Sequence, residues 1–381
     1  MGMRKVGNKV LDVWTLAEAF LPEDLSGLAL ETGAIVRLRN VEDASQLLRA
    51  ILLYASTGSF RTAAALASGS GLLHITAESL FYRLSHAEAF LESILAHLVS
   101  LSGGAPVGYQ LLIVDATTVS GPGATGMDWR VHVGYDPLRG LPCSLIATPP
   151  GTGEKLALHG LKPGHLVVAD RGYGTANNFH TAREAGADAL IRVSQGEIRL
   201  YDSTGERLRW EKLAAEVPPT GAVSFRFDMP VPPPGAKLGP TDSPPKAMAW
   251  HQVRLIAARN NRNDIVWLLT NLPHERLSED QACELYRARW QVELYFKRLK
   301  SLGDLDMQPS RDGPTAKAAL LAKLILLVLT SLIQDQEQAF SPFGYPVRKA
   351  RAEPLARIRL HPEKTRGRSV AQKAEPPVLT R

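Results

Sequence analysis

The first hundred residues place apolar side chains at helical spacing. This pattern predicts helices over residues 22–30, 41–55, 59–67 and 76–101. A short glycine-containing segment separates the last two, and two helices joined by such a turn are the parts of a helix-turn-helix. Arg61 and Arg83 would then face DNA. Similar hairpins occur in many proteins that never bind DNA, so the pattern predicts a helical N-terminal domain, residues 1–105, and leaves its DNA binding open.

The periodicity changes near residue 109. Residues 109–115 and 164–170 are short apolar runs that each end in an aspartate, Asp115 and Asp170. Such runs are typical of strands buried on both faces of a sheet. The pattern continues with an alternating run, an apolar run, a helix and a final apolar run, at residues 129–135, 141–147, 177–185 and 188–193. Strands followed by a strand-helix-strand crossover predict a mixed α/β sheet of five strands.

The region 196–274 interrupts this scheme. It contains short β-like runs and turns, including a hairpin expected over residues 197–210, and its segment 230–245 holds seven prolines in sixteen residues. Such a composition argues against a regular strand or helix in that segment. We therefore expect a β-rich insertion. After it, residues 315–334 read as a buried core helix, because their longest apolar run, 324–329, is far too short to span a membrane.

Composition changes this picture at the ends of the chain. Only Cys143 and Cys283 occur, which excludes a disulfide framework or a structural zinc site and favours a reducing cytoplasm. No apolar segment follows the first six residues, so no secretory signal is expected.

The net charge of +6 comes from the end of the chain, where residues 348–381 hold ten Lys/Arg against three Asp/Glu. We expect residues 337–381 to form a basic, disordered arm, which either contacts a polyanion such as DNA or only aids solubility.

Residues 286–300 contain no helix breaker and follow a capping sequence at Ser278, so we expect one continuous helix. One face of this helix carries a single carboxylate among aromatic and basic residues: Tyr286, Arg289, Glu293, Lys297 and Lys300. A solvated helix with intrahelical ion pairs has the same composition. The alternative is a metal-binding Glu293 flanked by cations that bind phosphates, and it requires carboxylates elsewhere in the chain.

Asp115 and Asp170 supply such carboxylates. If their strands are neighbours and parallel, both side chains emerge at one end of the sheet, where Glu293 can join them. Three carboxylates without His or Cys suit Mg²⁺, with Mn²⁺ as a substitute. Two such ions about 4 Å apart promote in-line attack on a phosphodiester, so the prediction is phosphoryl transfer on nucleic acid. Taken singly, each aspartate also fits an ordinary strand-end or Asx-type turn.

Three segments together closely resemble the signature regions of IS4-type insertion-sequence transposases. They are D-A-T-T-V at residues 115–119, D-R-G-Y at residues 170–173, and Y-x2-R-x3-E-x6-K at residues 286–300. The resemblance covers roughly residues 105–335. It implies an RNase H-like catalytic domain, formed by residues 106–195 and 275–336 and interrupted by the β-rich insertion 196–274. It also implies an intact DDE triad of Asp115, Asp170 and Glu293, and a helical N-terminal domain that binds the element's terminal repeats.

The activity implied is that of a DNA transposase that cleaves the ends of its element and joins the 3′-hydroxyls to target DNA. Its partners would be double-stranded DNA, as terminal inverted repeats and target, and further protomers in a homodimer or higher oligomer, with no membrane. The same resemblance favours phosphate contacts from Arg289, Lys297 and Lys300 and a DNA contact from Tyr286. We expect the protein in the bacterial cytoplasm, associated with the nucleoid when bound to DNA.

Two other functions fit the same motifs. One is a structure-selective nuclease on this fold without strand transfer, and the other is a non-catalytic, transposase-derived DNA-binding regulator. Aromatic and histidine residues do not decide between them. Core packing is expected for the insertion's tryptophans, rather than stacking on an unpaired base, and structural roles are expected for two histidines; these residues are Trp210, Trp250, Trp267, His132 and His159.

Overall fold

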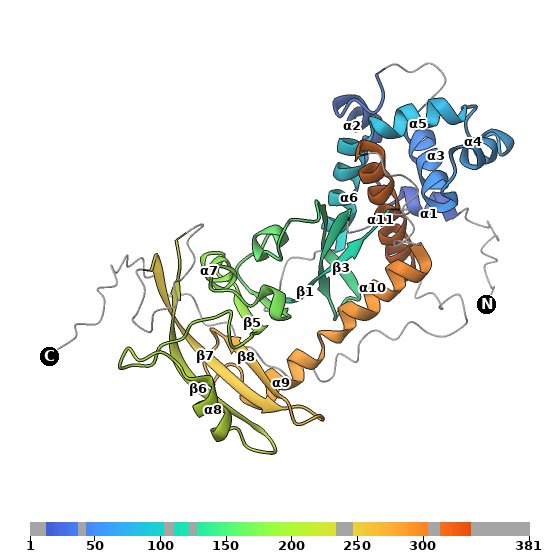
Figure 1. Cartoon of the computed structure of the whole chain (residues 1–381). Helices are drawn as coiled ribbons and strands as arrows, with labels where there is room; N and C mark the ends of the chain where they lie inside the picture. Colours follow the sequence, from blue (N-terminus) through green and yellow to red (C-terminus); the bar gives the residue numbers. More distant parts are fainter. Residues whose placement is uncertain are drawn as a thin grey trace, which may run out of the picture.

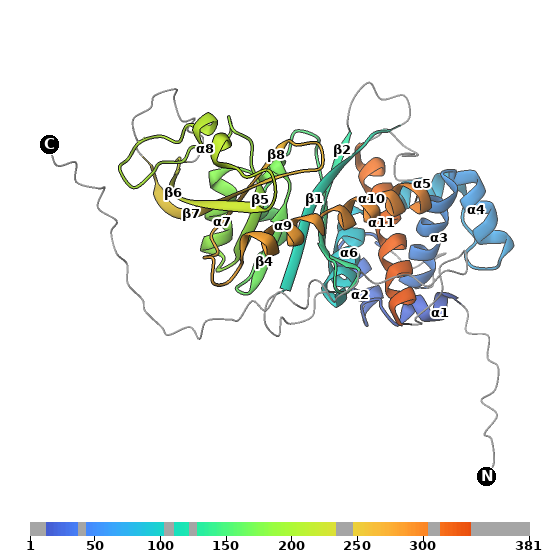
Figure 2. The ribbon, with the colours of Figure 1, turned by 90° about the horizontal axis from the view of Figure 1, so that it is seen from below.

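One mixed β-sheet organises the protein. The computed structural model describes residues 13–36, 43–102, 110–121, 128–233, 247–303 and 313–336. Eight strands form a single sheet in the order β3-β2-β1-β4-β5-β8-β7-β6. The expected basic arm, residues 337–381, lies outside the described residues. Figures 1 and 2 show the N-terminal helices gathered at one end of this sheet and the strands β6 to β8 at the other.

The first five strands have the predicted arrangement. Strands β1 to β3 pair antiparallel, and β4 and β5 run parallel to β1 on its other side. Their bounds are Gln110–Val119, Trp129–Asp136, Leu141–Thr148, His165–Ala169 and Asp188–Arg192. The connection from β3 to β4 contains the 3-10 helix η1 (Leu156–His159), and the one from β4 to β5 contains η2 (Arg171–Tyr173) and helix α7 (Ala176–Glu184). This topology confirms the RNase H-like mixed sheet.

The insertion is rich in strands, as predicted, but it forms no separate sheet. Its strands are β6 (Ala222–Val231), β7 (Ala249–Arg259) and β8 (Ile265–Thr270). Strand β8 pairs antiparallel with β5, so the insertion covers an edge that β5 would otherwise expose. The unit boundaries predicted from the sequence stay predictions.

Two details of the insertion were predicted wrongly. Strand β6 continues through Pro230 to Val231, paired with Trp250 and Ala249 of β7. This is possible because β6 is the outermost strand, where a missing N–H breaks no inner ladder. The hairpin expected over residues 197–210 is reduced to an isolated bridge between Tyr201 and Arg207, and helix α8 (Trp210–Glu216) begins where its second strand was expected.

The two faces of the sheet bury different hydrophobic clusters. Along β1, Leu111 and Ile113 join the cluster that contains the long C-terminal helices, whereas Leu112 and Val114 join the cluster that contains α7. This alternation follows from the two-residue period of a strand. Any side chain of the central strands can therefore be assigned to one face from its position in the sequence.

The N-terminal region, up to Ser102, is helical, as predicted. Its helices α1 to α6 are Val13–Glu18, Leu25–Glu31, Ala44–Thr57, Phe60–Gly69, Ala77–Ser85 and Glu88–Ser102, of which α1 was not predicted. The prediction of a single helix over residues 76–101 is wrong, because the helix is interrupted at His86. There the carbonyl of Tyr82 meets the side chains of Ser85 and His86, and the backbone N–H of His86 donates to Arg83 instead of continuing the α-helical ladder.

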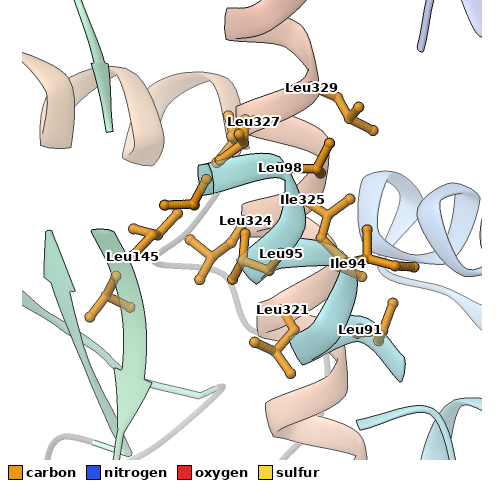
Figure 3. Packing of buried hydrophobic residues seen from close by; sticks show 14 of the residues in the cluster. Leu91, Ile94, Leu95, Leu98, Leu145, Leu321, Leu324, Ile325, Leu327 and Leu329 are labelled. Atoms are coloured by element: carbon orange, nitrogen blue, oxygen red, sulfur yellow. The ribbon is translucent and has the colours of Figure 1, made fainter. Parts of the chain in front are cut away.

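Helix α11 (Gly313–Gln336) is the core helix predicted for residues 315–334. Figure 3 shows its leucines and isoleucine interleaved with those of α6, and Leu145 of β3 closing the same cluster. By length and composition Thr315–Ile333 could cross a membrane, but 72% of this stretch is buried inside the protein. It has the burial of a core helix.

Candidate active site at the ends of strands β1 and β4

The two motif aspartates lie side by side in the sheet. Strands β1 and β4 are parallel neighbours, and their last aligned pair is Val114 and Ala169. Asp115 and Asp170 are the next residues of each chain segment, which confirms that the parallel arrangement brings them together. Asp115 does not end its strand as predicted, because β1 continues along β2 to Val119. It marks the point where β1 parts from β4.

Each aspartate is oriented by a backbone N–H one or two residues further along the chain. The N–H of Ala116 donates to Asp115 Oδ1 at 2.8 Å, and the N–H of Gly172 donates to Asp170 Oδ1 at 2.9 Å. The second bond is the Asx-type turn that the sequence allowed as an alternative. It leaves the other oxygen of Asp170 available, so a turn role and a role in chemistry are compatible.

The surroundings of Asp115 disfavour its charge. Burial raises the pKa of Asp115 to about 7, and repulsion from Asp170 and Glu154 adds to the effect, against the opposing influence of the Ala116 N–H and Arg289. A carboxyl group whose pKa is raised by burial and by a neighbouring acid is stabilised as an anion when a cation binds between the two.

The helix carrying the third motif is two helices. Helix α9 (Glu279–Arg287) begins at the predicted capping box of Ser278 and Gln281, and α10 (Trp290–Gly303) follows after a short break. Through the break the backbone N–H groups bond three residues back, as from Arg289 to Tyr286 at 3.1 Å. The continuous helix was therefore wrong at this turn, where tighter bonding lets Arg289 reach the sheet.

Arg289 joins the sheet to α10. Its Nη1 donates to Asp115 Oδ2 at 3.2 Å, and its Nη2 donates to Glu293 Oε1. Burial works against the charge of Arg289, but the hydrogen bond to Glu293, with Tyr286 and Asp115 nearby, leaves its pKa raised. The Arg289 guanidinium also lies 5.9 Å from the centre of the Tyr286 ring. Arg289 thus serves as the counter-ion of Asp115 and Glu293.

The remaining motif residues differ in exposure. Glu293 and Lys297 are exposed, whereas Tyr286 and Lys300 are half-buried. Burial raises the pKa of Tyr286, which also hydrogen-bonds with Arg192. Beyond Glu293, α10 therefore carries the exposed cation Lys297 and the half-buried cation Lys300.

A divalent cation fits the oxygen donors of this site, although the three predicted ligands are not gathered around one point. Among the described residues, no group of three His, Cys, Asp or Glu side chains is close enough to bind one ion. Asp115 and Asp170 follow the last paired residues of β1 and β4, while Glu293 is held by Arg289. Its participation requires Arg289 to release it.

The sequence reasoning missed a further carboxylate at this site, that of Glu154. Glu154 pairs with Arg130 at 3.7 Å, and burial together with Asp170 raises the pKa of Glu154. Its side chain fits against Gly172, where an added Cβ would lie 1.6 Å from Glu154 Oε2. A single Glu in a polar loop carries no periodic signal, so the sequence pattern could not have marked it.

The histidines and tryptophans are structural, as expected. Burial lowers the pKa of His132 to about 4 and that of His159 to about 3. His132 Nε2 lies 2.9 Å from Thr148 Oγ1, and His159 Nδ1 lies 2.6 Å from Ser144 Oγ. Trp210 and Trp267 are buried edge to face, with ring centroids 5.2 Å apart. The half-buried Trp250 meets Tyr201 in the same way, with ring centroids 5.6 Å apart.

Comparisons with known proteins show what this chain is similar to. Two Escherichia coli proteins, a putative transposase of insertion sequence IS186A and the transposase of IS421, are each 29% identical to this chain over 87% of its length and 96% of theirs. A solved piggyBac transposase in a synaptic complex with hairpin DNA aligns with a TM-score of 0.49 and 10% identity, over 92% of this chain and 80% of that one. The model of the transposase DDE domain family matches residues 106–329, which contain all three motifs, and the chain belongs to that family.

Proposed function

We propose that this protein is the transposase of an insertion sequence, which cleaves DNA at the ends of its element and joins the 3′-hydroxyls to target DNA. The observation that carries the proposal is the pairing of Asp115 with Asp170 at the ends of two parallel strands, with the α10 motif linked to Asp115 through Arg289. The family match and the names of the E. coli relatives support it.

The ligands proposed for the metal are Asp115, Asp170 and Glu293, and the ions are Mg²⁺, two per site, with Mn²⁺ as a substitute. When bound, such ions activate an attacking oxygen and stabilise the leaving oxygen of the phosphodiester. The chain's own contribution is positional. The two aspartates are oriented by backbone N–H groups, and Arg289, once it releases Glu293, would pair with a DNA phosphate.

The proposed DNA-facing residues are those of the α10 motif. Lys297 and Lys300 extend the line of cations beyond Glu293, and Tyr286 lies beside Arg289. Their partner is double-stranded DNA, both terminal repeat and target, and the active form is a homodimer or higher oligomer because two ends must be paired. The place of action would be the bacterial cytoplasm, at the nucleoid.

The test is a strand-transfer assay with duplex DNA that carries the element's end. Wild-type protein with Mg²⁺ should nick the uncut end and should join a pre-cut 3′ end to a target plasmid. Asp170→Asn should do neither, whereas Asp280→Asn, which changes an exposed carboxylate of α9, should do both. Cleavage without joining would instead indicate a nuclease. DNA binding without metal-dependent chemistry would indicate a regulator.

A further inference from the structure

The side chains around Asp115 and Asp170 come from both faces of the sheet. Arg130 and Val131 are successive residues of β2, and Val131 belongs to the cluster that also contains residues of α10 and α11. Arg130 therefore points to the opposite face, the one covered by α7. Its partner Glu154 precedes Leu156, which is buried in the cluster of that same face. Glu154 thus approaches from the face opposite Glu293.

The loop after β4 is shaped to receive the Glu154 carboxylate. An added Cβ at Gly172 would lie 1.6 Å from Glu154 Oε2 and 3.2 Å from Asp170 Oδ1. The two carboxylates therefore share the side of Gly172 where any larger residue would place its side chain. Glycine at this position leaves room for a second acid beside Asp170.

A buried amide fixes Glu154 in this place. The Asn178 side chain of α7 is only 5% exposed. Its Nδ2 donates to the carbonyls of Glu154 and Tyr173, each at 3.0 Å, and its Oδ1 accepts from the N–H of Leu156 at 2.9 Å. One side chain thereby ties the segment of Glu154 to the segment that follows Asp170. The three hydrogen bonds of this buried amide hold the two backbone segments that carry the acids at a fixed spacing.

Each flanking glutamate has its own arginine. Arg289 bridges Glu293 and Asp115 on one face, and Arg130 pairs with Glu154 on the other. Arg130 is only partly satisfied, since its buried Nε finds no hydrogen-bond partner in the described part of the chain.

We propose that Glu154 is a fourth carboxylate of the metal centre, which binds the divalent cation beside Asp170 directly or through its water, with Arg130 as its counter-ion and Asn178 as its positioning residue. This inference rests on the proposed function, because it needs a cation at Asp115 and Asp170. The centre then has a glutamate from each face of the sheet. Glu293 is available once Arg289 releases it, and the backbone of Glu154 is held by Asn178.

The test measures Mn²⁺ binding to the DNA-free protein by electron paramagnetic resonance. Glu154→Gln should weaken Mn²⁺ binding about tenfold to a hundredfold, the range for ligand-supporting groups. Glu154→Asp, which keeps the charge on a shorter stem, should bind with intermediate affinity. The matched control is Glu279→Gln, which should leave Mn²⁺ affinity unchanged. Glu279 also pairs with an arginine, Arg254, at an N–O distance of 3.1 Å, but this pair is not part of the site.

The outcomes separate this inference from the function beneath it. Wild-type-like Mn²⁺ affinity in Glu154→Gln, together with loss of binding in Asp115→Asn, would overturn the role of Glu154 and leave the metal centre standing. Equal binding by the wild type and by Asp115→Asn would instead remove the metal centre itself. Thermal unfolding of each metal-free variant checks folding, and weakened binding counts only if Glu154→Gln unfolds as cooperatively as the wild type.

Discussion

The layer between α6 and α11 and the acidic site around Asp115 and Asp170 show opposite uses of burial. In the first, the facing positions are aliphatic and fully buried, for example Ile94, Leu98, Leu324 and Ile325. In the second, acids and arginines are partly withdrawn from water next to one another. The first arrangement gains free energy on folding, whereas the second gives up some of that gain to hold acids ready for a cation. The fold thus separates the part that stabilises it from the part that reacts.

The largest expected effect breaks the aliphatic layer. Leu324→Ala removes a fully buried side chain between α6 and β3, and it should lower the free energy of unfolding by about 2–5 kcal/mol. Leu66→Ala on α4, where the leucine is 47% exposed, is the matched control and should change it by about 0.5 kcal/mol or less. Chemical denaturation measures both, and equal effects would contradict the assignment of α11 to the core.

A substitution in the acidic site should have the opposite effect on stability. Because the pKa of Asp115 is raised to about 7 in the folded protein, the unfolded chain loses this proton at lower pH than the folded one. Stability therefore falls as pH rises from about 4 to 7 and stays reduced above 7. Asp115→Asn removes this loss.

Without metal, Asp115→Asn should be more stable than the wild type at pH 8 by ~1–3 kcal/mol, with little difference at pH 4. Urea unfolding in the presence of a chelator measures the difference at both pH values. A mutant less stable than the wild type at pH 8 would show that the Arg289 pair outweighs the burial of Asp115.

The smallest expected effect lies on the face of α10 that carries Lys297 and Lys300. Lys300→Ala should reduce the slope of log affinity against log salt for end DNA by about 1, because one phosphate contact is lost. Lys297→Ala, on the same helix, should act similarly, whereas Lys212→Ala on α8, away from this face, should leave the slope unchanged. Equal slopes in all three variants would remove α10 from the DNA interface.

Local pattern predicted much of this molecule. Apolar runs identified the strands that carry Asp115 and Asp170, and the structure meets the condition that these strands are parallel neighbours. The helical spacing of the third motif put Arg289 and Glu293 on one face, and the structure pairs them. These features depend on residues close in sequence or on chain connectivity, which a pattern records.

The parts that were missed depend on distant contacts. The break between α9 and α10 has no breaker residue, and it places Arg289 against Asp115, 174 positions away in sequence. Strand β8 pairs with β5 because β5 would otherwise form an open edge of the sheet. No local sequence pattern predicts this pairing. The backbone of Glu154 is held near the site by a hydrogen bond from Asn178, a buried amide in a helix of ordinary composition. Tertiary hydrogen bonds of this kind leave no periodic trace.

The central claim is that Glu293, now paired with Arg289, is the third ligand in a metal-dependent DNA cleavage site. The most direct measurement is Mg²⁺-dependent nicking of end DNA by Glu293→Gln, with Glu284→Gln on α9, an exposed glutamate, as the control. Glu293→Gln should fold and bind end DNA nearly as the wild type does but show no nicking, while Glu284→Gln nicks normally. Wild-type nicking by Glu293→Gln would contradict the claim.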